Sequence, residues 1–187
     1  MKNRERKDWV QTSLKLAKEI ASLRSEDPYL QVGCCAIKEN GEIVLGYNGF
    51  PSGFSMSMED RDARRPYMIH AERNVLDMLG SDSIRVFSVT HLPCPECMKS
   101  IKSKKIGEVH YIDDLSDPKQ SQLSKKMAKD FGISLIREEA PQFEAKHKIT
   151  DLRKDVSSFI ESMDRSNLYN LYFYEVLKKL EEIESSL

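Results

Sequence analysis

The stretches "HAERN" (residues 70–74) and "PCPEC" (residues 93–97) form the most specific pattern in this sequence. The first places a histidine two residues before a glutamate, and the second frames two cysteines with prolines at a C-x-x-C spacing. Each stretch leads into residues with helical spacing, and a proline suits the first turn of a helix. We therefore expect both stretches to begin helices. The two cysteines would lie one turn apart at a helix N-terminus, where unpaired N–H groups and the helix dipole favour thiolates.

These residues form a ligand set of the kind that a catalytic zinc ion takes from a protein. Such a site uses three donors drawn from histidine nitrogen and cysteine sulfur and keeps a fourth position open. His70, Cys94 and Cys97 are such a set. Glu72, in the first turn of its helix, is expected to shuttle protons without binding the ion. The order H-x-E…P-C-x-x-C is the signature of zinc-dependent nucleobase deaminases, in which the metal activates a water and the glutamate moves the proton.

Two other interpretations of the C-x-x-C spacing are a structural zinc site and a thiol–disulfide pair. A structural site would need a fourth close ligand, and a redox pair would leave the histidine and the glutamate unexplained. Cys34 and Cys35 lie in a predicted strand and are expected to be small buried residues rather than ligands. His91 either lines the pocket or packs as an ordinary polar residue. His110 and His147 are not expected to bind metal.

Composition restricts the class of protein. The 187 residues fit one main domain with an appendage. Lys and Arg number 29 and Asp and Glu number 30, so the balance gives no broad electrostatic attraction to duplex DNA or to a membrane. The sequence shows neither a signal-peptide pattern nor a run of about 18 apolar residues. We therefore expect a cytoplasmic protein without a disulfide framework.

The order of predicted elements indicates an α/β fold. Apolar residues recur at helical spacing over residues 9–23. Residues 32–37 and 42–47 form a predicted β-hairpin, and its turn, Asn40-Gly41, is expected to supply residues with positive φ. Helices and strands alternate after residue 70, so the later strands are expected to be parallel.

Two segments interrupt this order. Residues 46–66 contain three glycines and two prolines and are predicted to be a functional loop. Pro141 ends the α/β pattern, and the charged residues 146–187 have helical spacing. We therefore expect a deaminase domain at residues 1–140 and a helical extension at residues 141–187.

In these motifs the chain resembles the cytidine deaminase superfamily and, more narrowly, the deoxycytidylate (dCMP) deaminases. The resemblance covers about residues 8–138 and rests on "RSEDP" (24–28), "QVGCCAI" (31–37), "GYNGFPSG" (46–53), "HAERN" (70–74) and "PCPECMKSI" (93–101). It implies a three-layer α/β/α fold with a five-stranded mixed sheet, to which the C-terminal helical extension is added. It also implies one zinc ion per chain and hydrolysis of dCMP to dUMP with release of ammonia.

The resemblance implies roles for further residues. The Ala71 backbone N–H would meet the base carbonyl, Asn48 would contact the sugar, and Tyr111 would stack near the base. The family also implies a homo-oligomer with dCTP as activator and dTTP as inhibitor, together with Mg²⁺. The segment for these effectors comprises Gly49, Pro51, Ser52 and Gly53.

A nucleotide substrate also requires a phosphate-binding group. Ser25, Arg61, Arg64 and Arg65 are the local candidates, because guanidinium groups match phosphate oxygens. The alternative is that the three arginines belong to a solvated loop face.

Two other classes of function stay open beside dCMP deamination. The first is a different substrate: dCTP, a free nucleoside or a base in RNA, as in tRNA adenosine deaminases. The pair His91-Leu92 replaces a bulky apolar pair of the family and leaves this selectivity open. The neutral charge and the GYNG block weigh against RNA. The second class is a catalytically silent nucleotide sensor or scaffold, and the presence of Glu72 argues against it.

Overall fold

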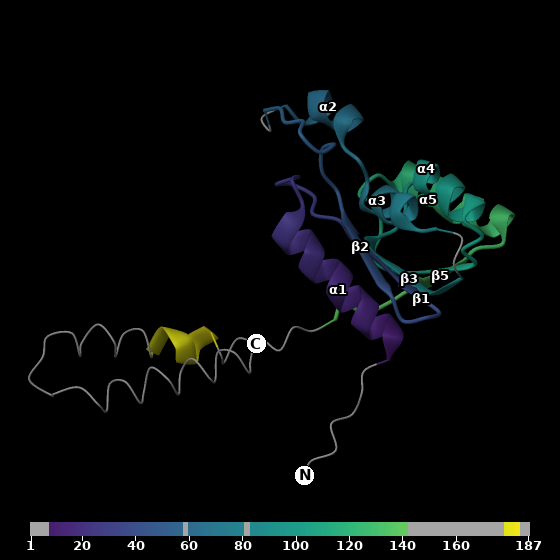
Figure 1. Ribbon diagram of the computed structural model, residues 1–187. Helices are drawn as coiled ribbons and strands as arrows, with labels where there is room; N and C mark the ends of the chain where they lie inside the picture. Colours follow the sequence, from purple (N-terminus) through teal and green to yellow (C-terminus); the bar gives the residue numbers. More distant parts are fainter. Residues whose placement is uncertain (1–7, 58–59, 81–82, 142–177, 184–187) are drawn as a thin grey trace, which may run out of the picture. The chain divides into compact units, whose positions relative to one another are not determined.

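The computed structural model describes residues 8–57, 60–80, 83–141 and 178–183 (Figure 1). The chain divides into two compact units, Met1–Pro141 and Gln142–Leu187. Residues 178–183 are the described part of the second unit, and they are helical. The rest of the predicted helical extension, including His147, lies outside the described residues. Among the described residues, no helix combines the length and the apolar character needed to cross a lipid bilayer.

A five-stranded mixed sheet forms the centre of the first unit, as predicted. Its order is β2-β1-β3-β4-β5, with β1 antiparallel to β2 and β3, and with β3, β4 and β5 parallel. The last three strands are parallel because a helix joins each of them to the next. The strands are β1 (Gly33–Lys38), β2 (Ile43–Tyr47), β3 (Ile84–His91), β4 (Glu108–Asp113) and β5 (Ser134–Arg137).

Helices cover both faces of this sheet and complete the predicted three-layer α/β/α arrangement. Figure 1 shows α1 on one side of the sheet and α3, α4 and α5 on the other. The helices are α1 (Trp9–Arg24), α2 (Arg61–Arg64), the 3₁₀ helix η1 (Arg65–Tyr67), α3 (Ala71–Met78), α4 (Pro95–Ser103) and α5 (Pro118–Phe131).

Two apolar clusters, one on each face of the sheet, hold the layers together. The larger cluster lies under α3, α4 and α5 and includes Phe87 and Met98, whereas the smaller one lies under α1 and includes Ala17. Every residue of β1 is buried, and its alternate side chains enter opposite clusters. Cys34 belongs to the larger cluster and Cys35 to the smaller, so both are buried residues as predicted.

Gly33 allows α1 to approach β1 closely. A Cβ atom at this position would lie 1.9 Å from the carbonyl oxygen of Ala17. We expect Gly33→Ala to lower the free energy of unfolding by about 1–3 kcal/mol, because backbone must move to admit the methyl group. Gly107→Ala is the matched control, since a Cβ there meets no described atom within 4 Å. Urea denaturation should show the control unchanged or more stable by up to about 1 kcal/mol; equal losses in the two variants would contradict this explanation.

The hairpin turn differs from the sequence prediction at one residue. Gly41 has a positive φ of 86°, but Asn40 does not adopt the left-handed conformation. The Gly41 N–H donates to the Lys38 carbonyl at 2.9 Å, which closes a turn in which a single left-handed residue is sufficient. The Asn40 side chain instead accepts a hydrogen bond from the Glu42 N–H at 2.9 Å. The turn therefore uses the glycine for its conformation and the asparagine for its side chain.

The predicted loop at residues 46–66 also differs, because it contains α2 and the start of η1. Asp60 caps α2: its carboxylate accepts hydrogen bonds from the N–H groups of Asp62 and Ala63, each at 3.0 Å. A helix of four residues spans only about one helical turn, which is far shorter than the window of about 11–18 residues in which apolar periodicity is recognised, so the pattern of the sequence does not reveal it.

Candidate active site

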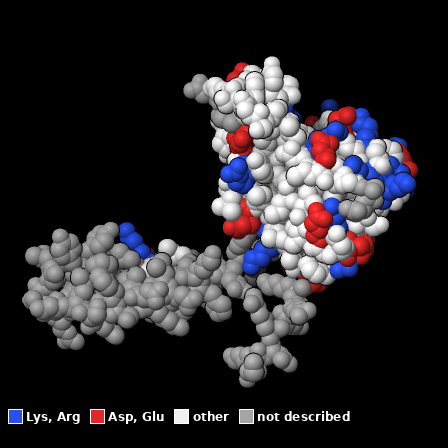
Figure 2. Space-filling view, viewed as in Figure 1, with Lys and Arg blue, Asp and Glu red and all other residues white. Residues whose placement is uncertain are grey.

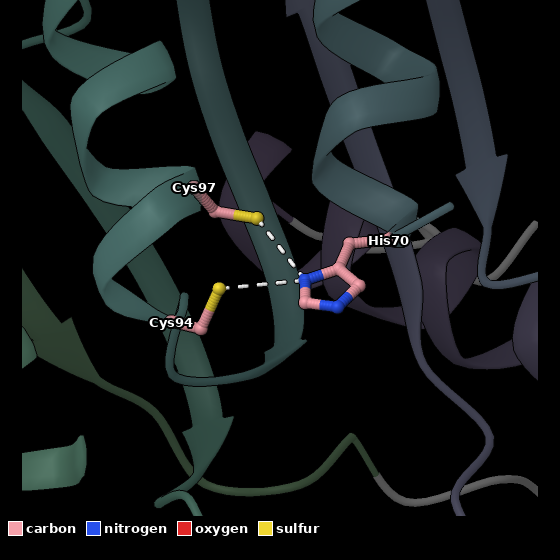
Figure 3. A group of neighbouring side chains, drawn as sticks. All are labelled: His70, Cys94 and Cys97. Atoms are coloured by element: carbon pink, nitrogen blue, oxygen red, sulfur yellow. Dashed lines mark hydrogen bonds between the residues drawn. The ribbon is translucent and has the colours of Figure 1, made fainter. Parts of the chain in front are cut away.

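The three predicted metal ligands converge in the structure (Figure 3). His70 Nδ1 lies 3.4 Å from the sulfur atoms of both Cys94 and Cys97, and all three donor atoms lie within 4.8 Å of one another. A tetrahedral zinc ion with bonds of about 2.0–2.3 Å would hold nitrogen and sulfur donors roughly 3.5 Å apart. The donor set therefore fits zinc both in chemistry and in spacing.

The N-termini of two neighbouring helices bring these ligands together. His70 is the N-cap residue of α3, Cys94 is the N-cap residue of α4, and Cys97 lies in the first turn of α4. The His70 side chain makes no capping hydrogen bond to the N–H groups of α3. These N–H groups and the two helix dipoles favour negative charge at this place. The site thus stabilises the thiolate form that binds metal.

The protonation of the two cysteines reflects this environment. Hydrogen bonding to Cys97 is the largest of several effects that lower the pKa of Cys94 to about 4, and a hydrogen bond with His70 adds to it. The same interaction with Cys94, together with burial, raises the pKa of Cys97. Cys94 is therefore the cysteine of the pair that loses its proton more readily.

Glu72 lies beside the ligands but outside the converging group. It is in the first turn of α3, and its side chain is buried, with 4% of the residue exposed. Burial raises the pKa of Glu72 to about 7, although the charge of His70 opposes the rise. A carboxyl group with a pKa near the working pH can both accept and release a proton, which is the property needed for general acid–base catalysis.

Asn48 holds the segment at residues 25–32 against the end of β2. Its Oδ1 accepts hydrogen bonds from Ser25 Oγ at 2.6 Å and from the Val32 N–H at 2.8 Å, and its Nδ2 donates to the Leu30 carbonyl at 2.8 Å. These bonds use both acceptor positions of the amide and one of its two N–H groups. The sugar contact of Asn48 and the phosphate contact of Ser25 stay predictions, while their scaffold role is a structural fact.

The three arginines of the predicted loop have different surroundings. Arg61 and Arg65 are exposed, whereas Arg64 is fully buried and donates to Asp27 at 2.8 Å. Arg64 is thus paired inside the protein, whereas we expected its side chain to be available to a phosphate. Hydrogen bonding to Cys94 raises the pKa of His70, and the positive charge of Arg65 opposes this rise. Arg65 therefore lies within electrostatic range of the ligand group.

The roles of Tyr111 and of the segment expected to bind effectors stay predictions. Tyr111 is buried in the larger cluster, and its pKa is raised first by burial and then by the charge of Asp114. Gly53 has a φ of 81° in a turn closed by the Phe54 N–H and the Pro51 carbonyl at 3.0 Å. This turn explains the glycine locally, whatever binds there.

The two other histidines in the described part of the chain, His91 and His110, contact protein neighbours. His91 is half-buried, its Nδ1 lies 3.1 Å from Thr90 Oγ1, and burial lowers its pKa. His110 is buried, with its two ring nitrogens 2.8 Å from Glu138 and 2.9 Å from Glu108. The two carboxylates contact opposite ring nitrogens of His110, so the three side chains do not converge on one point as the ligands of a metal ion do.

Two residues of the site region, Asn74 and Asp27, lie in the quoted stretches HAERN and RSEDP, but no role is predicted for either from the sequence. Asn74, in the HAERN stretch, donates from Nδ2 to the Tyr47 carbonyl at 2.6 Å and so fixes α3 to β2. Asp27 lies buried at the start of a loop and pairs with Arg64. An aspartate before a proline suggests a turn in which its side chain bonds to nearby backbone. The residues around Asp27 do not indicate that it pairs with a distant arginine.

A three-layer fold with a His–Cys–Cys group at two helix N-termini is typical of zinc-dependent deaminases. Residues 7–113 match the family described as the cytidine and deoxycytidylate deaminase zinc-binding region. The chain therefore belongs to the cytidine and deoxycytidylate deaminase zinc-binding family.

Individual relatives agree with this membership. The deoxycytidylate deaminase of Homo sapiens is 36% identical over 106 residues, which are 51% of this chain and 60% of that protein. The ComE operon protein 2 of Bacillus subtilis (strain 168) is 28% identical over 98% of this chain and 97% of that protein. The dCMP deaminase of cyanophage S-TIM5, solved in complex with dCMP and dUMP, is 27% identical with a TM-score of 0.59 and covers 72% of this chain and 100% of that chain. The chain spans about three fifths of the length of the human relative.

Proposed function

We propose that this chain is a zinc-dependent hydrolase that deaminates dCMP to dUMP and releases ammonia. The observation that carries the proposal is the convergence of His70, Cys94 and Cys97 beside the buried carboxyl group of Glu72. Two findings support dCMP as the substrate. Relatives of the chain include deoxycytidylate deaminases, and a structural neighbour was solved with dCMP and dUMP.

The residues of the chain have separate tasks in this reaction. His70, Cys94 and Cys97 would hold the zinc ion, which would supply an activated water at neutral pH. Glu72 accepts a proton during the attack on the base and returns a proton to the leaving amine, so that it acts first as base and then as acid. The Ala71 N–H is at the first position of α3, whose N-cap side chain leaves the early N–H groups uncapped. It is therefore suited to hold the base carbonyl.

Arg65 is the proposed contact to the 5′-phosphate. We expect Arg65→Gln to lower kcat/KM for dCMP by about 10–100-fold, because hydrogen bonds to charged groups contribute about 1.5–3 kcal/mol. Deoxycytidine, which lacks the phosphate, should be processed as by the wild type. Arg61→Gln is the matched control, since Arg61 is an exposed arginine of the adjoining helix α2. Steady-state kinetics with both substrates measures the difference, and an equal loss for the two substrates would contradict the assignment.

The substrate is tested by ammonia release from deoxycytidine, dCMP, dCTP, CMP and adenosine-containing RNA. We expect the highest kcat/KM for dCMP. On the face shown in Figure 2, acidic and basic side chains lie beside one another, so the described part of this face does not form the continuous basic surface that RNA binding requires.

The same assay with dCTP or dTTP and Mg²⁺ tests the proposed effectors, and sedimentation of the full chain tests the proposed homo-oligomer. Faster turnover of dCTP, nucleoside or RNA than of dCMP would contradict the proposed substrate.

A further inference from the structure

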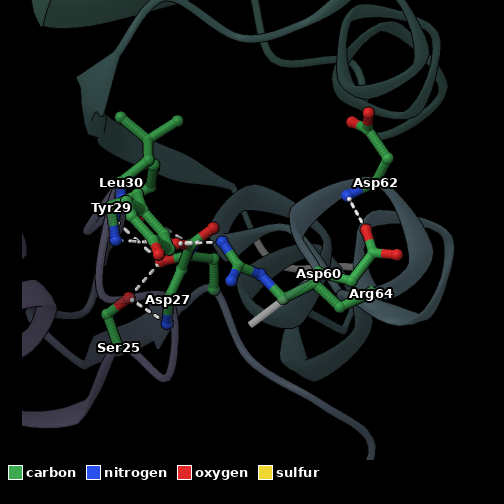
Figure 4. Close-up of polar contacts among 9 residues, drawn as sticks. Ser25, Asp27, Tyr29, Leu30, Asp60, Asp62 and Arg64 are labelled. Carbon is green, nitrogen blue, oxygen red and sulfur yellow. Dashed lines mark hydrogen bonds and ion pairs between the residues drawn. The ribbon is translucent and has the colours of Figure 1, made fainter. Parts of the chain in front are cut away.

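Asp27 and Arg64 form a buried ion pair between segments 37 positions apart in the chain (Figure 4). Arg64 Nη2 lies 2.8 Å from Asp27 Oδ1, and the two side chains are 0% and 9% exposed. The Tyr29 ring covers the guanidinium group, with the Arg64 Cζ 4.9 Å from the ring centroid. The same carboxylate oxygen accepts hydrogen bonds from the N–H groups of Tyr29 at 2.8 Å and Leu30 at 3.2 Å. One carboxylate therefore shapes its own loop and binds α2 to that loop.

Stability alone does not account for this arrangement. Burying two charges costs free energy that their attraction rarely exceeds, so apolar side chains of similar volume are often equally stable or more stable. Breaking such a pair is nevertheless costly, because one charge is then left buried without its partner. A pair of this kind therefore fixes one geometry of the segments that it joins. The question is which groups depend on that geometry.

On the arginine side, the pair leads directly to the candidate active site. Arg64 is followed by Arg65, the proposed phosphate contact. Further along, Ile69 pairs with Gly49 through two backbone hydrogen bonds of 2.8 and 3.1 Å, and the next residue is the metal ligand His70. Segment 60–69 is therefore held near its middle by Arg64 and at its C-terminal end by the bridge to Gly49.

On the aspartate side, the pair leads to the proposed sugar contact. The Asp27 N–H donates to Ser25 Oγ at 3.3 Å, and Ser25 Oγ donates to Asn48 Oδ1 at 2.6 Å. Asn48 directly precedes Gly49, so the contacts form a closed ring through both loops. Loss of the ion pair opens this ring at the point where α2 meets the loop of residues 25–30.

We propose that the Asp27–Arg64 ion pair is a positioning element that fixes segment 60–69 against the loop of residues 25–30. It thereby holds Arg65 in place relative to Asn48 and sets the preference for a phosphorylated substrate. The part concerning substrate preference rests on the proposed function, whereas the part concerning the position of segment 60–69 does not. Neither residue touches the substrate in this proposal.

The variants separate loss of the pair from loss of a hydrogen-bond acceptor. Asp27→Asn keeps the side-chain shape and an oxygen that can accept from the N–H groups of Tyr29 and Leu30, but it removes the charge. Arg64→Met removes the cation and keeps a long apolar side chain. The double variant carries neither charge, so no charge of the pair is left buried. Glu39→Gln is the control, because Glu39 pairs with Arg85 at 3.1 Å on the exposed surface.

Hydrogen–deuterium exchange on the zinc-loaded full chain tests the position of the segment without any substrate. We expect both single variants and the double variant to exchange at least about tenfold faster than wild type in peptides covering residues 60–70, because the segment opens more often once its anchor is removed. The Glu39→Gln control should exchange as wild type does. Wild-type exchange of residues 60–70 in all three variants of the pair would overturn the proposal.

Kinetics tests the consequence for selectivity. We expect the ratio of kcat/KM for dCMP to that for deoxycytidine to fall at least about tenfold, with zinc content unchanged. A purely structural role predicts equal losses for the two substrates, or wild-type selectivity in the double variant, and either result would overturn the proposal. Should a single variant fail to fold, the double variant provides the test. A wild-type chain that deaminates neither substrate would refute the proposed function, and the exchange experiment then decides the positioning role alone.

Discussion

Replacement of Glu72 by glutamine is expected to lower ammonia release from dCMP by roughly 10²–10⁴-fold, the contribution typical of a positioned acid–base group. Glutamine has nearly the same shape, but its amide group neither accepts nor releases a proton near neutral pH. The buried position of Glu72 and its pKa of about 7 are the reasons for expecting the loss in kcat. Zinc content should stay at the wild-type level, because Glu72 is outside the converging ligand group.

The control for this prediction is Glu96→Gln. Glu96 lies in the first turn of the neighbouring helix α4, but its side chain is exposed and pairs with Lys99 at 2.6 Å. We expect it to keep wild-type turnover. Metal analysis and steady-state kinetics of both variants provide the comparison. A Glu72→Gln variant that retains a tenth of wild-type turnover would remove Glu72 from the reaction.

Replacement of Cys97 by alanine is expected to abolish stoichiometric zinc binding and, with it, deamination. Two donors, His70 and Cys94, would remain of a site that needs three protein ligands. Cys35→Ala is the matched control, because Cys35 is also buried but lies under α1, on the opposite face of the sheet from the ligand group. Metal analysis after dialysis should find about one zinc per chain in wild type and control and almost none in Cys97→Ala. Stoichiometric zinc in Cys97→Ala would refute the assigned ligand set.

Much of the site could be predicted because its residues are tied to local structure. The H-x-E and P-C-x-x-C spacings place donors at helix N-termini, and each of these helices begins at the expected position. Alternation of helices and strands was sufficient to predict that β3, β4 and β5 are parallel. The resemblance to the deaminases supplied the five-stranded mixed sheet, which no local pattern reveals.

The remaining features depend on contacts between distant segments. Arg61, Arg64 and Arg65 are equivalent in the sequence, yet Arg64 is buried and the other two are exposed. The position of Asp27 decides this difference, and Asp27 belongs to a loop that reaches α2 only in the folded chain. Asn48 shows the same limit: the resemblance to the deaminases implied a sugar contact, while the structure shows three hydrogen bonds that organise its own surroundings.

We propose that this chain binds zinc with His70, Cys94 and Cys97 and uses it to deaminate dCMP. The most direct measurement is quantification of dUMP and ammonia formed from dCMP by the zinc-loaded full chain. We expect dUMP and ammonia to form in equal amounts. A folded chain with one bound zinc that forms neither product, under conditions where a known dCMP deaminase is active, would contradict the proposal.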